Sequence, residues 1–192
     1  MNKIHVKLAM IVGIIFVAAL SRILPHPLNF SPLVAISLFG GAMFHHTWKA
    51  FVIPVAAYLL SDLLFVALGQ PGFYGTSQFF VYGSMILVVA LGTTLKRPKA
   101  LKVVGYSLAG STIFWIVSNF GVWAANYFAA GTTIYEPHLT LGFTYLRALP
   151  FYNSFASQLF LGSFVGDLFY SSVLFGAFSL AQKYIPALRY AS

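Results

Sequence analysis

The stretch Leu8-Ala-Met-Ile-Val-Gly-Ile-Ile-Phe-Val-Ala-Ala-Leu20 contains no charged or hydrogen-bonding side chain. Lys3 and Lys7 precede it, and the next charge, Arg22, comes only after it ends. About 20 predominantly apolar residues cross the hydrocarbon core of a bilayer as a helix, and fewer suffice when flanking side chains reach the interface. The stretch therefore predicts a first membrane-spanning helix, over residues 8–24.

The composition of the whole chain also indicates a protein surrounded by lipid. Of its 192 residues, 59% are hydrophobic and only 7% are charged. A soluble domain of this size would need several times more charge to cover its surface. Most of the surface is therefore expected to face a lipid bilayer, and residues 1–192 are expected to form a single transmembrane domain.

Five further apolar runs lie between charges and turn residues, which predicts an all-α bundle of six transmembrane helices. The second run is short for a span, and Ser31 followed by Pro32 is typical of a helix start. The expected helices cover residues 8–24, 31–46, 50–69, 79–95, 103–128 and 153–182. The connection between the last two is long, and a structureless connection of that length is uncommon unless it is functional.

The basic residues divide unevenly between the two sides of such a bundle. One side would hold Lys3, Lys7, Lys49, Lys96, Arg97, Lys99, Lys102, Lys183 and Arg189. The other side would hold Arg22 and Arg147. Because cytoplasmic loops are enriched in Lys and Arg, this division predicts that both termini are cytoplasmic. It also explains the net charge of +8, so no nucleic-acid partner is expected.

Residues 1–21 also have the features of a cleavable signal peptide, with two lysines before an apolar stretch that contains the small residues Ala18 and Ala19 near its end. Its removal would leave five spans and would put the remaining charges on the wrong side. The first helix is therefore expected to remain in the protein.

Several classes of chemistry find no support in the residues. The chain contains no cysteine, which excludes disulfides, thiolate metal sites and a cysteine nucleophile. It contains no H-E-x-x-H, G-x-S-x-G or Walker A motif. No catalytic residue and no intrinsic cofactor are therefore expected.

Two acidic residues, Asp62 and Asp167, fall inside expected spans. Ionisable groups within a membrane are costly and mark functional sites by default. The alternative is a structural ion pair with Arg22 or Arg147, or a hydrogen-bonded helix contact. Asn119, Trp123 and Asn126 follow one another at helical spacing and would form an inward polar stripe.

Aromatic and hydrogen-bonding residues collect in the connections on the outer side. They are Arg22, His26, Asn29, Tyr74, Gln78, Tyr82, Tyr135, Glu136, His138, Tyr145, Arg147 and Tyr152. Tyrosines also line membrane interfaces regardless of function, which is the alternative for any single one. As a cluster they predict a pocket open to the outside that suits a polar ligand with flat rings.

Several motifs along the chain resemble a bacterial family of six-span proteins that is itself similar to the substrate-binding S components of energy-coupling factor transporters. The motifs are R-I-L-P-H-P-L-N-F-S-P at 22–32, F-G-G-A-M-F at 39–44, S-D at 61–62, S-N-F-G-V-W at 118–123, L-P-F-Y at 149–152 and G-D-L at 166–168. The resemblance spans nearly the whole chain. It implies a bacterial cytoplasmic membrane protein that binds a vitamin near its outer face.

Within that class the pattern is most similar to the solitary S components that take up cobalamin. The residues that carry this similarity are His26, Asp62, Tyr82 and Arg147. With the polar positions described above, the expected substrate-binding residues are His26, Asn29, Asp62, Tyr74, Tyr82, Asn119, Trp123, Arg147 and Asp167. Some of those proteins present a cysteine to cobalt, which this chain lacks, so His26 is the residue that could replace it. Ala9 and Gly13 would dock on a transmembrane coupling protein that works with ATPases.

Three alternatives remain open at the level of the sequence. The chain could be an S component for a different vitamin. It could be a membrane-embedded enzyme that uses Asp62 or Asp167 with His26 as acid–base groups on a lipid-soluble substrate. It could also be a helical subunit without a ligand.

Overall fold

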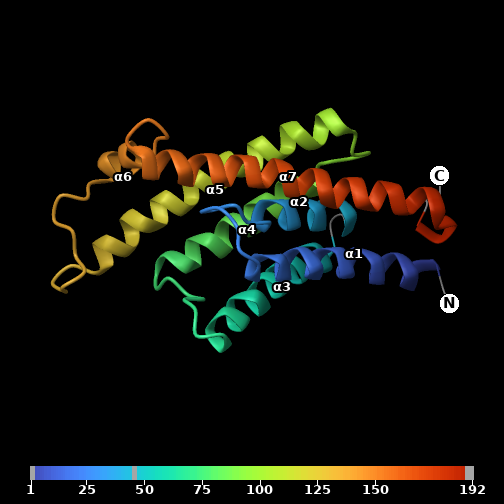
Figure 1. The fold of residues 1–192 in the computed structure, drawn as a ribbon, viewed down its shortest axis with the longest axis horizontal. Coiled ribbons are helices and arrows are strands. Elements are labelled where there is room, and N and C mark those ends of the chain that lie inside the picture. The colour runs from blue at the N-terminus through green and yellow to red at the C-terminus, as the bar shows by residue number, and fades with distance from the viewer. Residues whose placement is uncertain (1–2, 45–46, 189–192) are drawn as a thin grey trace.

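The structure, a computed structural model, describes residues 3–44 and 47–188. Within these ranges all regular secondary structure is helical (Figure 1). The α-helices are α1 (Lys3–Leu20), α2 (Leu33–Phe44), α3 (Trp48–Ala67), α4 (Ser77–Thr93), α5 (Ala100–Phe128), α6 (Leu141–Arg147) and α7 (Ser154–Tyr184). Short 3₁₀ helices follow α1 and α7, at Ser21–Ile23 and Pro186–Leu188.

Four segments are long and apolar enough to cross a membrane: His5–Ile23, Trp48–Ala67, Ala100–Phe128 and Ser154–Tyr184. The apolar helices α2 and α4 have 12 and 17 residues and are shorter than a full span. The chain is therefore an all-helical, multi-pass membrane protein.

The structure corrects some helix boundaries. The α-helical part of the first helix ends at Leu20 and not at residue 24, because the chain tightens into a 3₁₀ turn. The second helix begins at Leu33, where the Pro32 carbonyl accepts a hydrogen bond from the Ile36 amide. Its expected end, residues 45 and 46, lies outside the described residues, as does Arg189 of the charge count.

Helix α6 was not expected from the sequence. It occupies the long connection before α7, and the Thr140 hydroxyl caps its start by accepting a hydrogen bond from the Phe143 amide at 3.2 Å. The Tyr145 hydroxyl donates to the Ile116 carbonyl of α5 at 2.7 Å, and burial raises the pKa of Tyr145. The connection is thus folded back onto α5.

Helix α2 forms the centre of the bundle, and every residue from Leu33 to Met43 is buried. A helix that is apolar on all sides needs apolar neighbours on all sides, and α2 packs on α3, α4 and α7. Its closest approach is to α4, where a Cβ atom on Gly41 would lie 2.3 Å from the Val89 carbonyl oxygen and 2.9 Å from the Gly92 Cα. Because protein surrounds α2, this helix does not need the length of a lipid-facing span.

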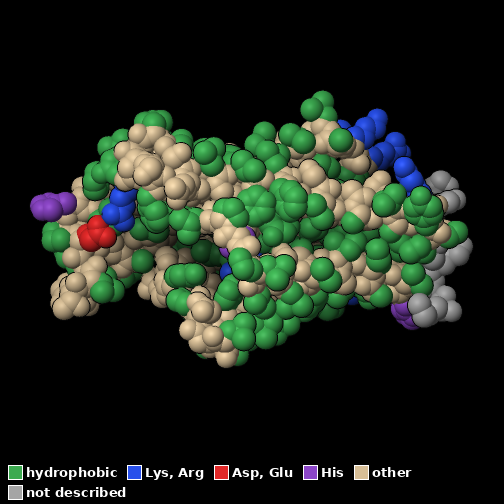
Figure 2. Space-filling model, in the orientation of Figure 1, with side chains coloured by type: hydrophobic (Ala, Val, Ile, Leu, Met, Phe, Trp, Pro, Cys, Tyr) green, Lys and Arg blue, Asp and Glu red, His purple; other side chains and the backbone are tan. Residues whose placement is uncertain are grey.

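The two ends of the molecule differ in charge. Both termini and the connection between α4 and α5 lie at one end of the long axis, and α6 lies at the other (Figure 1). Lys and Arg side chains gather at the end that holds the termini (Figure 2). The uneven distribution expected from the sequence is therefore present along the long axis of the bundle.

Candidate functional site

A buried ion pair joins the end of the first helix to α3. The Arg22 guanidinium donates to Asp62 Oδ1 at 2.6 Å, and the two side chains are 9% and 1% exposed. Arg22 also donates to the Ser61 hydroxyl, which itself donates to the Tyr58 carbonyl. The sequence left Arg22 and Arg147 as possible partners of Asp62, and in the structure the partner is Arg22.

The second oxygen of Asp62 is also fully used. It accepts hydrogen bonds from Gln78 Nε2 at 2.9 Å and from the Tyr82 hydroxyl at 2.7 Å. The Arg22 guanidinium lies 3.8 Å from the centre of the Tyr58 ring, within the range of a cation–π interaction. Three donors to Asp62, including Arg22 itself, and an aromatic face next to Arg22 thus compensate a charge pair that would otherwise be costly to bury.

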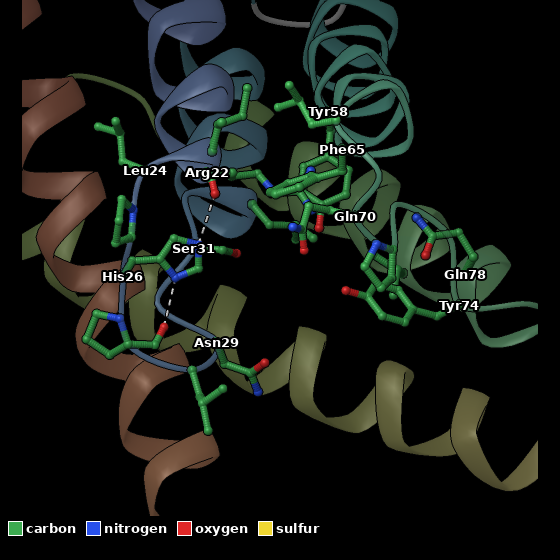
Figure 3. Close-up of a pocket in the computed structure, with 18 of the residues that line it drawn as sticks. Arg22, Leu24, His26, Asn29, Ser31, Tyr58, Phe65, Gln70, Tyr74 and Gln78 are labelled. Carbon is green, nitrogen blue, oxygen red and sulfur yellow. Dashed lines mark hydrogen bonds between the residues drawn. The ribbon is translucent and has the colours of Figure 1, made fainter.

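A cavity of about 810 Å³, hereafter the first cavity, opens beside this ion pair. Its polar and aromatic lining consists of Arg22, His26, Asn29, Ser31, Tyr58, Phe65, Gln70, Tyr74, Gln78 and Phe114. Tyr74 and Gln78 lie across the cavity from the α1–α2 connection, which carries His26 and Asn29 (Figure 3). Asp62 and Tyr82 do not line the cavity; they lie behind its wall, where they hold Arg22 and Gln78 in place.

His26 is held by two backbone carbonyl groups (Figure 3). Its Nδ1 lies 2.8 Å from the Pro27 oxygen and its Nε2 lies 3.2 Å from the Arg22 oxygen. A carbonyl oxygen only accepts, so both bonds form together only when both ring nitrogens carry hydrogen. Coordination of a metal by His26 therefore requires one of these bonds to break.

A cavity of about 670 Å³, hereafter the second cavity, lies between α5, α6 and α7. Its polar lining consists of Asn29, Trp115, Ser118, Asn119, Arg147, Tyr152, Asn153 and Ser163. Asn29 and Phe114 line both cavities, so the two are neighbours. Arg147 lines the second cavity and pairs with Glu136 at 3.0 Å, so it lies apart from the Arg22–Asp62 pair beside the first cavity.

The loop between the cavities is fixed to α7. Asn29 has a φ of 57°, in the left-handed region that asparagine tolerates better than most residues, and its side-chain amide donates to the Leu159 carbonyl at 3.4 Å. A Cβ atom on Gly162 would lie 1.8 Å from the Leu28 carbonyl oxygen. Only glycine at 162 lets the loop rest at this depth on α7.

Besides Asp62 and Tyr82, two more of the residues expected in the site line neither cavity. Trp123 packs between the rings of Phe120 and Tyr127 on the same helix. Asp167 is 3% exposed and lies between α5 and α7, where the Ser111 hydroxyl is 2.7 Å from its Oδ2. Asn126, from the expected polar stripe, bonds to the backbone of Glu136 and so fixes the connection after α5.

The sequence did not single out Tyr58, Phe114 or Trp115. Tyr58 lies one helical turn before Asp62, and this spacing could have identified it as a neighbour. Phe114 and Trp115 carry no comparable signal, because aromatic residues are frequent throughout the chain. In residues 3–44 and 47–188 no group of three or more His, Asp or Glu side chains is placed to hold a metal ion.

The fold and these cavities define a multi-pass helical membrane protein with two adjacent pockets at one end of the bundle. The chain belongs to a family of unknown function, DUF6580, whose model matches residues 2–188. Neither a curated protein nor a solved structure matches the chain.

Proposed function

We propose that this protein is a substrate-binding membrane component for vitamin uptake, similar to the S components of energy-coupling factor transporters. The observation that carries the proposal is the first cavity. Its volume falls within the range of about 300–1,000 Å³ typical of small-molecule sites, and its lining combines aromatic rings with fixed hydrogen-bonding groups. Hydrogen bonds from Arg22 and Gln78 to Asp62 fix both side chains at the cavity wall, which supports a preformed site.

A corrinoid is the leading substrate of this proposal. Such a ligand is large, carries amide groups around a flat ring and has cobalt at its centre. The two neighbouring cavities offer rings, hydrogen-bond donors and acceptors, and the imidazole of His26. An S component for another vitamin is the alternative that the same cavities would serve.

The membrane enzyme alternative receives less support from the contacts. His26 bonds to the carbonyl groups of Arg22 and Pro27, whereas Asp62 bonds to Arg22, Gln78 and Tyr82. Asp167, the other acid of that alternative, bonds to Ser111. Neither acid is therefore hydrogen-bonded to His26, as the acid–base pair of that alternative would need.

Calorimetric titration of the purified protein tests the proposal. We expect cobalamin and cobinamide to bind, and coordination by His26 to shift the absorption spectrum of the bound corrinoid. His26→Ala should abolish that shift, whereas His138→Ala, a histidine that lines neither cavity, should retain it. If another vitamin binds in place of the corrinoids, the corrinoid assignment is wrong; if no vitamin binds, the proposed function is wrong.

The proposed orientation has six spans with both termini in the cytoplasm of a bacterial cell. Because the chain has no cysteine, a single introduced thiol reports its own side of the membrane. In intact cells a membrane-impermeant maleimide should label His138→Cys but not Lys99→Cys, which should react only after permeabilisation. Both positions are exposed, so the reverse pattern would contradict the orientation.

The proposed docking site for a transmembrane coupling protein is an apolar groove of about 400 Å³ between α1 and α7. Ala9, Gly13, Val17, Val173 and Ala177 line it, and no atom lies within 4 Å of a Cβ atom placed on Gly13. Gly13→Leu should therefore fill the groove without disturbing the fold.

We expect Gly13→Leu to abolish uptake in cells while ligand affinity stays unchanged. Gly105→Leu is the matched control, since Gly105 of α5 also has open space around its Cα. Equal uptake by the two variants would contradict docking at the groove.

A further inference from the structure

Asp167 differs from Asp62 in having no cationic partner. The ion pairs within the described part of the chain join Asp62 to Arg22 and Glu136 to Arg147, and none includes Asp167. A buried carboxylate without a counter-charge costs several kcal/mol within a membrane. Some other cation must therefore neutralise it.

The hydrogen bonds around Asp167 favour a proton as this neutralising cation. The Ser111 hydroxyl lies 2.7 Å from Asp167 Oδ2 and 2.9 Å from the Ser107 carbonyl oxygen. A hydroxyl has one hydrogen to donate, and the carbonyl can only accept. Both bonds form together when Asp167 carries a proton and donates it to Ser111, which then donates to Ser107. Asp62, in contrast, meets only donors and is an ionised acceptor.

No other titratable group faces Asp167 from the helices packed on α7. Helix α2 has no titratable residue. Those of α1 lie in its first two turns, whereas the segment that reaches Tyr170, next to Asp167, is the turn at Ser21 after the other end of α1. On α5 the Tyr106 hydroxyl bonds to Thr94, and on α7 the Tyr170 hydroxyl is hydrogen-bonded to the Ser21 hydroxyl of the turn after α1. The neighbours that remain are Ser107, Ser111 and Ser171, and Ser171 donates to the Ser107 hydroxyl at 3.2 Å.

The second cavity gives this group a route to the outside. Ser163, which lines that cavity, precedes Asp167 by four residues, or about 6 Å along the helix. We propose that Asp167 with Ser107 and Ser111 forms a proton-binding site that exchanges its proton through the second cavity. Release of the proton leaves a carboxylate that needs water or a cation from that cavity.

Infrared spectroscopy of the full-length protein in lipid nanodiscs tests the site directly. The chain has only three acidic side chains, Asp62, Glu136 and Asp167, so the carbonyl band of a protonated carboxyl group is readily assigned. At neutral pH we expect this band in the wild type and in Glu136→Gln, and its loss in Asp167→Asn. It should shift in D₂O and disappear as the pH rises.

A second measurement uses the wild-type protein, so its result does not depend on whether a variant folds. Dicyclohexylcarbodiimide is an apolar reagent that reacts with protonated carboxyl groups, and mass spectrometry locates the adduct. We expect the adduct on Asp167 and none on Asp62, with labelling of Asp167 lost at high pH. Absence of both the band and the adduct would overturn the site, and a band that does not shift in D₂O would overturn proton exchange through the cavity.

Discussion

Replacement of Asp62 by alanine is expected to lower the free energy of unfolding by about 3–5 kcal/mol, because it leaves the Arg22 charge buried without a partner. It also removes the acceptor for Gln78 and Tyr82. Denaturant or thermal unfolding in nanodiscs gives the measurement. Since Arg22 and Gln78 line the first cavity, ligand affinity should fall with stability.

The exposed ion pair between Glu136 and Arg147 provides the matched control. Glu136 and Arg147 are 58% and 33% exposed, and exposed pairs contribute about 0–1 kcal/mol, so Glu136→Ala should leave stability nearly unchanged. The double variant Arg22→Met/Asp62→Leu removes both buried charges and should lose less stability than Asp62→Ala alone. Equal losses for Asp62→Ala and Glu136→Ala would show that the buried pair is not a structural element.

Gly41→Leu is expected to cost about 3 kcal/mol or more, at or above the usual upper end for overpacking a core. The atoms that a side chain at 41 would meet are the Val89 carbonyl oxygen and the Gly92 Cα, both of which belong to the α4 backbone. No rotamer change can relieve such a contact, so α2 and α4 must separate. Loss of the folded fraction in size-exclusion chromatography and a lower melting temperature would report it.

Gly83→Leu is the control for that experiment. Gly83 lies in α4, as Gly92 does, but no atom comes within 4 Å of a Cβ atom placed on it. Gly41→Leu and Gly83→Leu both replace a helical glycine by leucine and add the same side-chain volume. If both are equally stable, the close crossing of α2 and α4 does not limit packing.

The apolar runs predicted most of the helices because their lengths and flanking charges follow from the bilayer itself. The buried acids were also predictable as special positions. Their different environments were not, because the pairing of Asp62 with Arg22 depends on how the turn after α1 meets α3. Nothing in the sequence around Asp167 shows that no cation reaches it.

The division of the outer residues into two cavities was also beyond the sequence. His26 and Arg147 both belong to the outer connections, and the residues alone favoured a single pocket. The separation arises from the backbone at Asn29 and from the depth at which Gly162 accepts the loop. Helix α6 was missed for a related reason, since seven residues carry too little periodicity to be distinguished from a loop.

The central position of α2 also bears on how the protein is made. Ribosomes deliver α2 to the membrane before α4 and α7, the helices that enclose it. With 12 residues it extends about 18 Å, too short to settle across a bilayer by itself. During synthesis α2 is therefore expected to remain beside α1 and α3, or within the insertion machinery, until α4 and α7 have been inserted. Assembly of this bundle is thus completed from its C-terminal half.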